Sequence, residues 1–100
     1  MLLFCLLLTS FGINPSEALE ITLPPETATL TKSTLTGYLL VQKNCLICHS
    51  AQYIQLQPQT SQRLYWEATV RKMKAVFGAR FSDEEIFPMV EYLVKTYGTN

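Results

Sequence analysis

The sequence has few side chains that could build a metal site or a catalytic centre: one histidine and three cysteines in 100 residues. Charge is also scarce and balanced, with eight basic and eight acidic side chains, so nothing indicates a nucleic-acid-binding surface. There is no internal repeat and no low-complexity tract. The length therefore predicts one small domain, whose chemistry must come from a short motif.

The first eighteen residues are typical of a secretory signal peptide. Leu2 to Leu8 form an apolar core, and Ser16-Glu17-Ala18 matches the small-x-small pattern of a cleavage site. The apolar run is too short to span a bilayer. No basic residue lies near Met1, which is atypical, and the alternative is a buried N-terminal strand or helix. We expect cleavage near Ala18, export to the periplasm, and a mature chain without a membrane span.

The segment Cys45-Leu46-Ile47-Cys48-His49 is the most informative part of the sequence. Cys-x-x-Cys-His is the attachment pattern of a c-type haem. Two residues between the cysteines let one helical turn present both thiols to the same porphyrin edge, where each forms a thioether with a vinyl group. The adjacent His49 can then ligate the iron. The motif predicts one covalent haem c, anchored by Cys45 and Cys48.

Two other interpretations of the cysteine pair are weaker. A structural zinc site takes four nitrogen or sulfur ligands, and the mature chain offers only Cys45, Cys48 and His49. A carboxylate or a second chain would have to complete it. A thioredoxin-like redox pair is expected next to a βαβ pattern, and the sequence shows none.

The residues before the motif divide into an arm and a helix. Residues 19–32 contain Pro24-Pro25, which disfavours a helix, so we expect an extended N-terminal arm lying on the domain or on a partner. The alternative is a disordered terminus. A first helix is expected from about Ser33 to Asn44. Gly37 lies inside it, which makes sense if another helix crosses closely at that point.

After the motif we expect a polar loop over 50–60 and two further helices. The first runs from about Ser61 to Phe77 and ends at Gly78. The second begins with Ser82 and Glu85, which form a capping box, and ends near Gly98. Pro88 should kink that helix or delay its regular start. The sequence thus predicts an all-α domain over 33–98, with three or more helices around one haem.

A single histidine excludes bis-histidine ligation within the chain, so we expect a methionine, the usual second axial ligand of a soluble electron carrier; Lys72 or Lys74 at alkaline pH is a weaker candidate. Methionine ligation raises the reduction potential. Met73 is preferred, since it lies between the motif and the last helix, and Met89 is the alternative. For either methionine, core packing is the ordinary role. A backbone carbonyl near Pro58 is a candidate acceptor for the Nδ1 hydrogen of His49, and an ordinary turn proline is the alternative.

At this point the sequence resembles a class I cytochrome c, with the first helix entering the haem motif and the last crossing it at Gly37. A closer resemblance, over nearly all of the mature chain, is to the small haem subunit of periplasmic sulfite dehydrogenases. Its most specific part is the Trp66-x6-Met73 pattern. The segments that carry it are ITLP (21–24), NCLICHSAQYI (44–54), QP (57–58), WEATVRKM (66–73), FGA (77–79) and VEYL (90–93).

This resemblance implies a periplasmic electron-transfer subunit without catalytic residues of its own. It would take single electrons from a molybdenum-cofactor subunit that oxidises sulfite and pass them to a soluble acceptor protein. It also implies that His49 and Met73 are the axial ligands. Arg80-Phe81 departs from the family pattern, where a smaller apolar residue is expected.

Other functions remain open at this stage. A free soluble cytochrome c, or the haem subunit of another dehydrogenase, would have the same motif. A gas-binding haem sensor would leave the distal side of the iron open. Four basic side chains around Met73 could form a docking patch for an acidic partner, although a solvated helix face is the simpler interpretation; they are Arg71, Lys72, Lys74 and Arg80.

Overall fold

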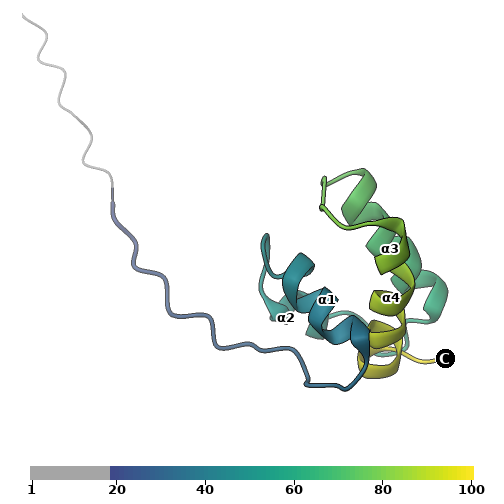
Figure 1. Cartoon of the computed structure of the whole chain (residues 1–100). Helices are drawn as coiled ribbons and strands as arrows, with labels where there is room; N and C mark the ends of the chain where they lie inside the picture. The colour runs from purple at the N-terminus through teal and green to yellow at the C-terminus, as the bar shows by residue number, and fades with distance from the viewer. Residues whose placement is uncertain (1–18) are drawn as a thin grey trace, which may run out of the picture.

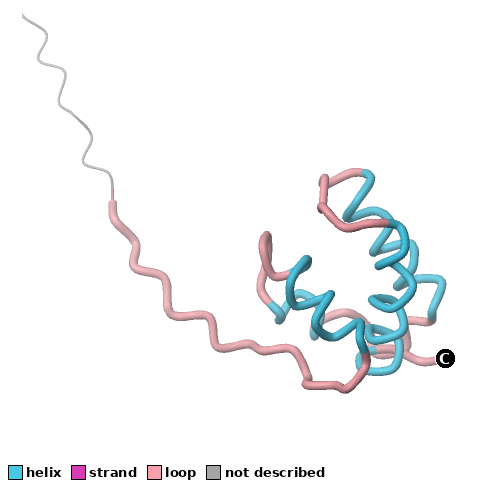
Figure 2. Tube along the Cα trace, viewed as in Figure 1, coloured by secondary structure: helices cyan, strands magenta, loops and turns pink. Residues whose placement is uncertain are grey.

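A computed structural model describes residues 19–100, and their regular structure is helical (Figures 1 and 2). The predicted signal peptide lies outside the described residues. The helices are α1 (Thr36–Cys45), α2 (Ala51–Gln55), α3 (Arg63–Ala75) and α4 (Asp83–Tyr97). No β-strand forms within residues 19–100, where a single isolated bridge joins Gln62 to Thr99. The prediction of an all-α domain is therefore confirmed for this part of the chain.

The first and last helices cross at Gly37, as the sequence predicted. A Cβ atom added at Gly37 would lie 2.6 Å from the backbone carbonyl carbon of Pro88 and 2.8 Å from Cβ of Tyr92. Both distances are shorter than a van der Waals contact, so only glycine lets the two backbones approach this closely. The crossing fixes α1 on α4, and Cys45 stands at the far end of α1.

The last helix forms the centre of the core. Its first turn is closed by the predicted capping box, in which the Ser82 amide donates to Glu85 Oε2 at 2.8 Å. Pro88 does not delay the helix, which is regular from Asp83 onward because the capping box sets the first turn before the proline is reached. Its buried residues pack between α1 and α3; they are Ile86, Met89, Val90, Tyr92, Leu93 and Val94.

The segment after the motif differs from the prediction of a polar loop over 50–60. It contains α2, whose first turn is capped by the Ser50 hydroxyl accepting from the Gln52 amide at 3.2 Å. Ala51 and Ile54 are buried at a spacing of three residues. The cap at Ser50 and the burial of Ala51 and Ile54 therefore stabilise a short helix in a mainly polar segment.

The third helix ends slightly earlier than predicted, at Ala75. The chain then turns at Gly78, which has a φ of 71°, a left-handed conformation that glycine adopts at little cost. Beyond this turn the Ala79 amide donates to the Met73 carbonyl at 3.0 Å. The turn thereby ties down the backbone of the residue predicted to ligate the iron.

Candidate functional site

The motif lies where α1 ends and the chain turns toward α2. Cys45 is the last residue of α1 and is partly buried, whereas Cys48 lies in the following turn and is exposed. Both are free thiols. Burial raises the pKa of the Cys45 thiol to about 11. At neutral pH this thiol is protonated, and in the folded chain it is a poor nucleophile.

His49 is held in a defined orientation beside the motif. Its Nδ1 lies 3.2 Å from the backbone carbonyl oxygen of Ser50, so the tautomer with a proton on Nδ1 donates there and leaves Nε2 free as a ligand. The imidazole also packs against Tyr53, with 5.3 Å between ring centroids. The imidazole therefore does not bond near Pro58, where an acceptor was expected, and the Pro58 carbonyl accepts from the Ser61 amide at 2.9 Å.

Met73 reaches the site from α3, one face of which carries Trp66, Val70 and Met73 at i, i+4 and i+7. Trp66 and Val70 are buried, and Met73 is partly exposed. The face is fixed by contact of α3 with α4. The sulfur of Met73 is thus presented by a packed helix rather than by a loop.

These groups line one cavity of about 400 Å³, to which α1, α2 and α3 all contribute residues. Cys45, His49 and Met73 all lie on its wall. Cys48 and Pro58 do not line it, and neither does Met89, which is completely buried in the core of α4. Its remaining lining residues are Tyr53, Ile54, Gln57, Tyr65, Trp66, Thr69, Val70, Lys72, Phe81 and Leu93.

Some residues of this cavity were not singled out from the sequence. The Tyr65 hydroxyl donates to Gln57 Oε1, which links α3 to the segment after α2. Thr69 precedes Met73 by one helical turn, a spacing that could have placed it on the same face. The Tyr65–Gln57 contact had no such signal, because it depends on how two distant segments pack.

The cavity brings together three of the four groups that a covalent haem would need, and Cys48, the fourth, lies outside it. The cavity falls within the range of about 300–1,000 Å³ that is usual for pockets holding organic ligands. Its wall is mainly apolar, with one imidazole and one thioether as donors, and a thiol stands at its edge. Within residues 19–100 no group of three or more His, Cys, Asp or Glu side chains comes together as a metal site. The donor set therefore matches haem iron better than a zinc ion.

The basic residues near Met73 are partly paired. Arg71 binds Glu67 at 2.8 Å, and Lys74 binds Asp83 at 2.6 Å. The hydrogen bond and the charge of Lys74 hold the pKa of Asp83 below its ordinary value. Lys72 lies on the cavity wall and is exposed. Two of the four predicted docking charges are thus already matched by carboxylates.

Comparison with known proteins adds nothing to this description, since no protein-family model matches the chain and no curated protein is similar enough to count as a match. In the part of the chain that the structure describes, none of the helices has the length and apolar character needed to cross a bilayer. A function has to be inferred from the motif and from the cavity beside it.

Proposed function

We propose that this chain is a c-type cytochrome that transfers single electrons. Cys45 and Cys48 hold one haem covalently, and His49 and Met73 are the axial ligands of its iron. The observation that carries this proposal is the shared cavity. His49, the last residue of the Cys-x-x-Cys-His segment, lines the same mainly apolar cavity as Met73, although 23 residues lie between them in the sequence.

The chain's own residues would set the properties of the site. A haem supplies one-electron iron chemistry, and His and Met ligands give it a raised reduction potential. The Ser50 carbonyl accepts from His49 Nδ1, which orients the imidazole and increases its basicity as a ligand. The side chains of Trp66 and Val70 are buried and would give the haem an apolar contact surface.

A second part of the proposal concerns the proteins that give electrons to this cytochrome and accept them from it. Its support is the resemblance to the haem subunits of periplasmic sulfite dehydrogenases. On this view the chain breaks no bonds itself. It receives electrons from a molybdenum-cofactor subunit in the periplasm and delivers them to a soluble acceptor protein.

The optical spectrum of the haem-loaded protein tests the ligands. We expect a sharp reduced α band and the weak far-red band of methionine-ligated ferric haem. Met73→Leu should abolish the far-red band, because leucine has a similar volume but no sulfur. Met89→Leu is the matched control and should keep it, because Met89 does not line the cavity.

Three results would contradict the proposal. Survival of the far-red band in Met73→Leu would show that Met73 is not the ligand. Rapid binding of carbon monoxide by the unmodified reduced protein would favour an open distal site and a gas sensor. A protein that carries no haem, when made in cells able to attach it, would reject the cytochrome assignment itself.

A further inference from the structure

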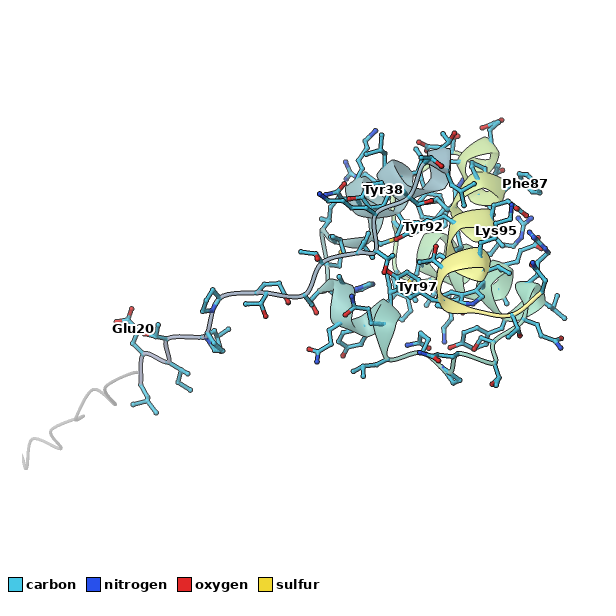
Figure 3. All side chains as sticks on the ribbon, turned by 90° about the horizontal axis from the view of Figure 1, so that it is seen from below. Glu20, Tyr38, Phe87, Tyr92, Lys95 and Tyr97 are labelled. Atoms are coloured by element: carbon cyan, nitrogen blue, oxygen red, sulfur yellow. The ribbon has the colours of Figure 1, made fainter. Side chains whose placement is uncertain are left out.

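Tyr53 is placed differently from the tyrosines that pack between α1 and α4. Tyr92 packs edge to face against both Tyr38 and Tyr97, with 5.7 and 5.9 Å between ring centroids (Figure 3). The Tyr92 hydroxyl donates to the Thr31 carbonyl at 2.7 Å, so this cluster holds the root of the N-terminal arm, which projects away from the domain (Figures 1 and 3). Tyr53 lies outside the cluster, on α2, where it lines the cavity and is 67% exposed. Burial in the core therefore does not explain the position of this ring.

The ring of Tyr53 packs against the imidazole of His49. Tyr53 follows His49 by four residues, and the two rings lie 5.3 Å apart between centroids, with 35° between their planes. The Ser50 carbonyl oxygen joins the same two residues, because it accepts from the Tyr53 amide at 3.2 Å and lies 3.2 Å from His49 Nδ1. We propose that Tyr53 is a positioning residue whose ring sets the orientation of the His49 imidazole as an axial ligand. This inference rests on the proposed function.

The backbone of Tyr53 is held firmly although its side chain is exposed. Ala51 and Ile54, on the same short helix, are buried and fix α2 on the domain. Gln57 Nε2 donates to the Tyr53 carbonyl at 2.9 Å, and Gln57 Oε1 accepts from the Tyr65 hydroxyl. Since Tyr65 belongs to α3, the Gln57 amide ties the end of α2 to that helix. The ring of Tyr53 therefore packs on the imidazole from a fixed base.

The hydrogen bond to Ser50 alone restrains the imidazole weakly. Its length of 3.2 Å is at the long end of the N–H···O range, and its acceptor is shared with the Tyr53 amide. His49 is also only partly buried, so the surrounding core does not enclose the ring. A packed aromatic ring supplies a second restraint, because it blocks rotation of the imidazole toward one side.

Proton NMR of the ferric, haem-loaded protein tests this role. The plane of an axial imidazole determines how the unpaired electron of low-spin ferric iron is distributed over the porphyrin, so the haem-methyl resonances report that orientation. Tyr53→Leu removes the aromatic ring but keeps an apolar side chain. We expect the haem-methyl resonances to shift relative to one another and their order to change. A role in stability alone would leave that order as it is.

Two further variants are the controls. Tyr53→Phe keeps the ring and should retain the haem-methyl pattern of the unmodified protein. Leu56→Ala removes an apolar side chain from the same segment, at a position that is 74% exposed and does not line the cavity, and should also retain the pattern. Because both positions are exposed, we expect all three variants to fold, and circular dichroism measures this directly.

The outcomes separate this inference from the proposed function. A changed haem-methyl pattern in Tyr53→Leu, with the original pattern in Tyr53→Phe and Leu56→Ala, would support the positioning role. An unchanged pattern in Tyr53→Leu, or an equal change in either control, would overturn it. The far-red band of methionine-ligated ferric haem should persist in all three variants, so either result leaves the proposed function intact. An unmodified protein that carries no haem would instead refute the proposed function, and this inference with it.

Discussion

The side chains of the candidate site are positioned by contacts of different kinds. His49 is oriented by the carbonyl of its neighbour Ser50, whereas Met73 depends on the packing of a whole helix. Met89 has no exposed surface and belongs to the core. Truncating a buried methionine to alanine costs about 2–5 kcal/mol, so leucine is the appropriate replacement when the ligands are compared.

Replacing Gly37 by alanine tests the helix crossing at the residue level. Alanine favours a helix by about 1 kcal/mol over glycine, but here its Cβ would meet the backbone of Pro88. We expect Gly37→Ala to lower the free energy of unfolding by about 1–3 kcal/mol, the usual effect of overpacking. Urea unfolding measures this difference. The control is Gln42→Ala, an exposed position of the same helix, and a stabilised Gly37→Ala protein would contradict the crossing.

How far single residues could be predicted depends on the range of their contacts. The close approach at Gly37 and the capping box of Ser82 follow from local sequence and were correct. The partner of the His49 imidazole was expected at Pro58, and the structure pairs it with Ser50 instead. Which carbonyl meets an imidazole depends on how the loop folds, and short motifs do not determine that.

At the scale of elements, the end of α3 and the start of α4 are joined electrostatically across the turn at Gly78. Lys74 lies in the last turn of α3 and binds Asp83, the first residue of α4. Lys74 also stands 5.9 Å from the centre of the Phe81 ring, which lines the cavity. This contact positions the turn that follows Met73.

The ion pair predicts a pH dependence. Because Lys74 lowers the pKa of Asp83 in the folded state, the pair stabilises the protein above the ordinary carboxyl pKa of 3.8, and this contribution disappears as the pH falls through the lower folded pKa. The difference in stability between the unmodified protein and Asp83→Asn should therefore shrink in acid. An NMR titration supplies the direct measurement: in Lys74→Met the Asp83 midpoint should rise. An unchanged midpoint would show that the pair is not formed in solution.

The elements themselves were predictable to different degrees. α3 and α4 have clear apolar faces, and α4 has a cap, so both could be predicted within a few residues of their ends. α2 was missed because five residues carry too little periodicity to detect. Its stability comes from the Ser50 cap and from burying Ala51 and Ile54 in the assembled domain.

At the scale of the whole molecule, the cavity is large for so short a chain. A small domain has a total stability of about 5–15 kcal/mol. The cavity is open to solvent on one side, and its mainly apolar wall is exposed to water when nothing fills it. A group that covers this wall adds to a small total stability, so we expect the domain to depend on what fills the cavity.

We therefore expect the haem-free protein to be poorly folded. The double variant Cys45→Ala/Cys48→Ala cannot anchor haem through thioethers, and it should show weak helical circular dichroism and no cooperative thermal transition. Cys48→Ala alone is the control, because it keeps one anchor and His49. A double variant that unfolds cooperatively without haem would contradict this expectation.

The crossing of α1 and α4 also determines when Cys45 becomes buried during the synthesis and folding of the chain. Thr31 and Tyr92, and Gly37 and Pro88, meet only after the last helix has been synthesised. Until then the end of α1 is open and the Cys45 thiol is hydrated. Once the domain closes, burial raises the pKa of this thiol to about 11, so its reactive thiolate form becomes scarcer. For the proposed haem attachment, Cys45 is therefore the better nucleophile in the interval before closure, which ends when α4 packs on α1.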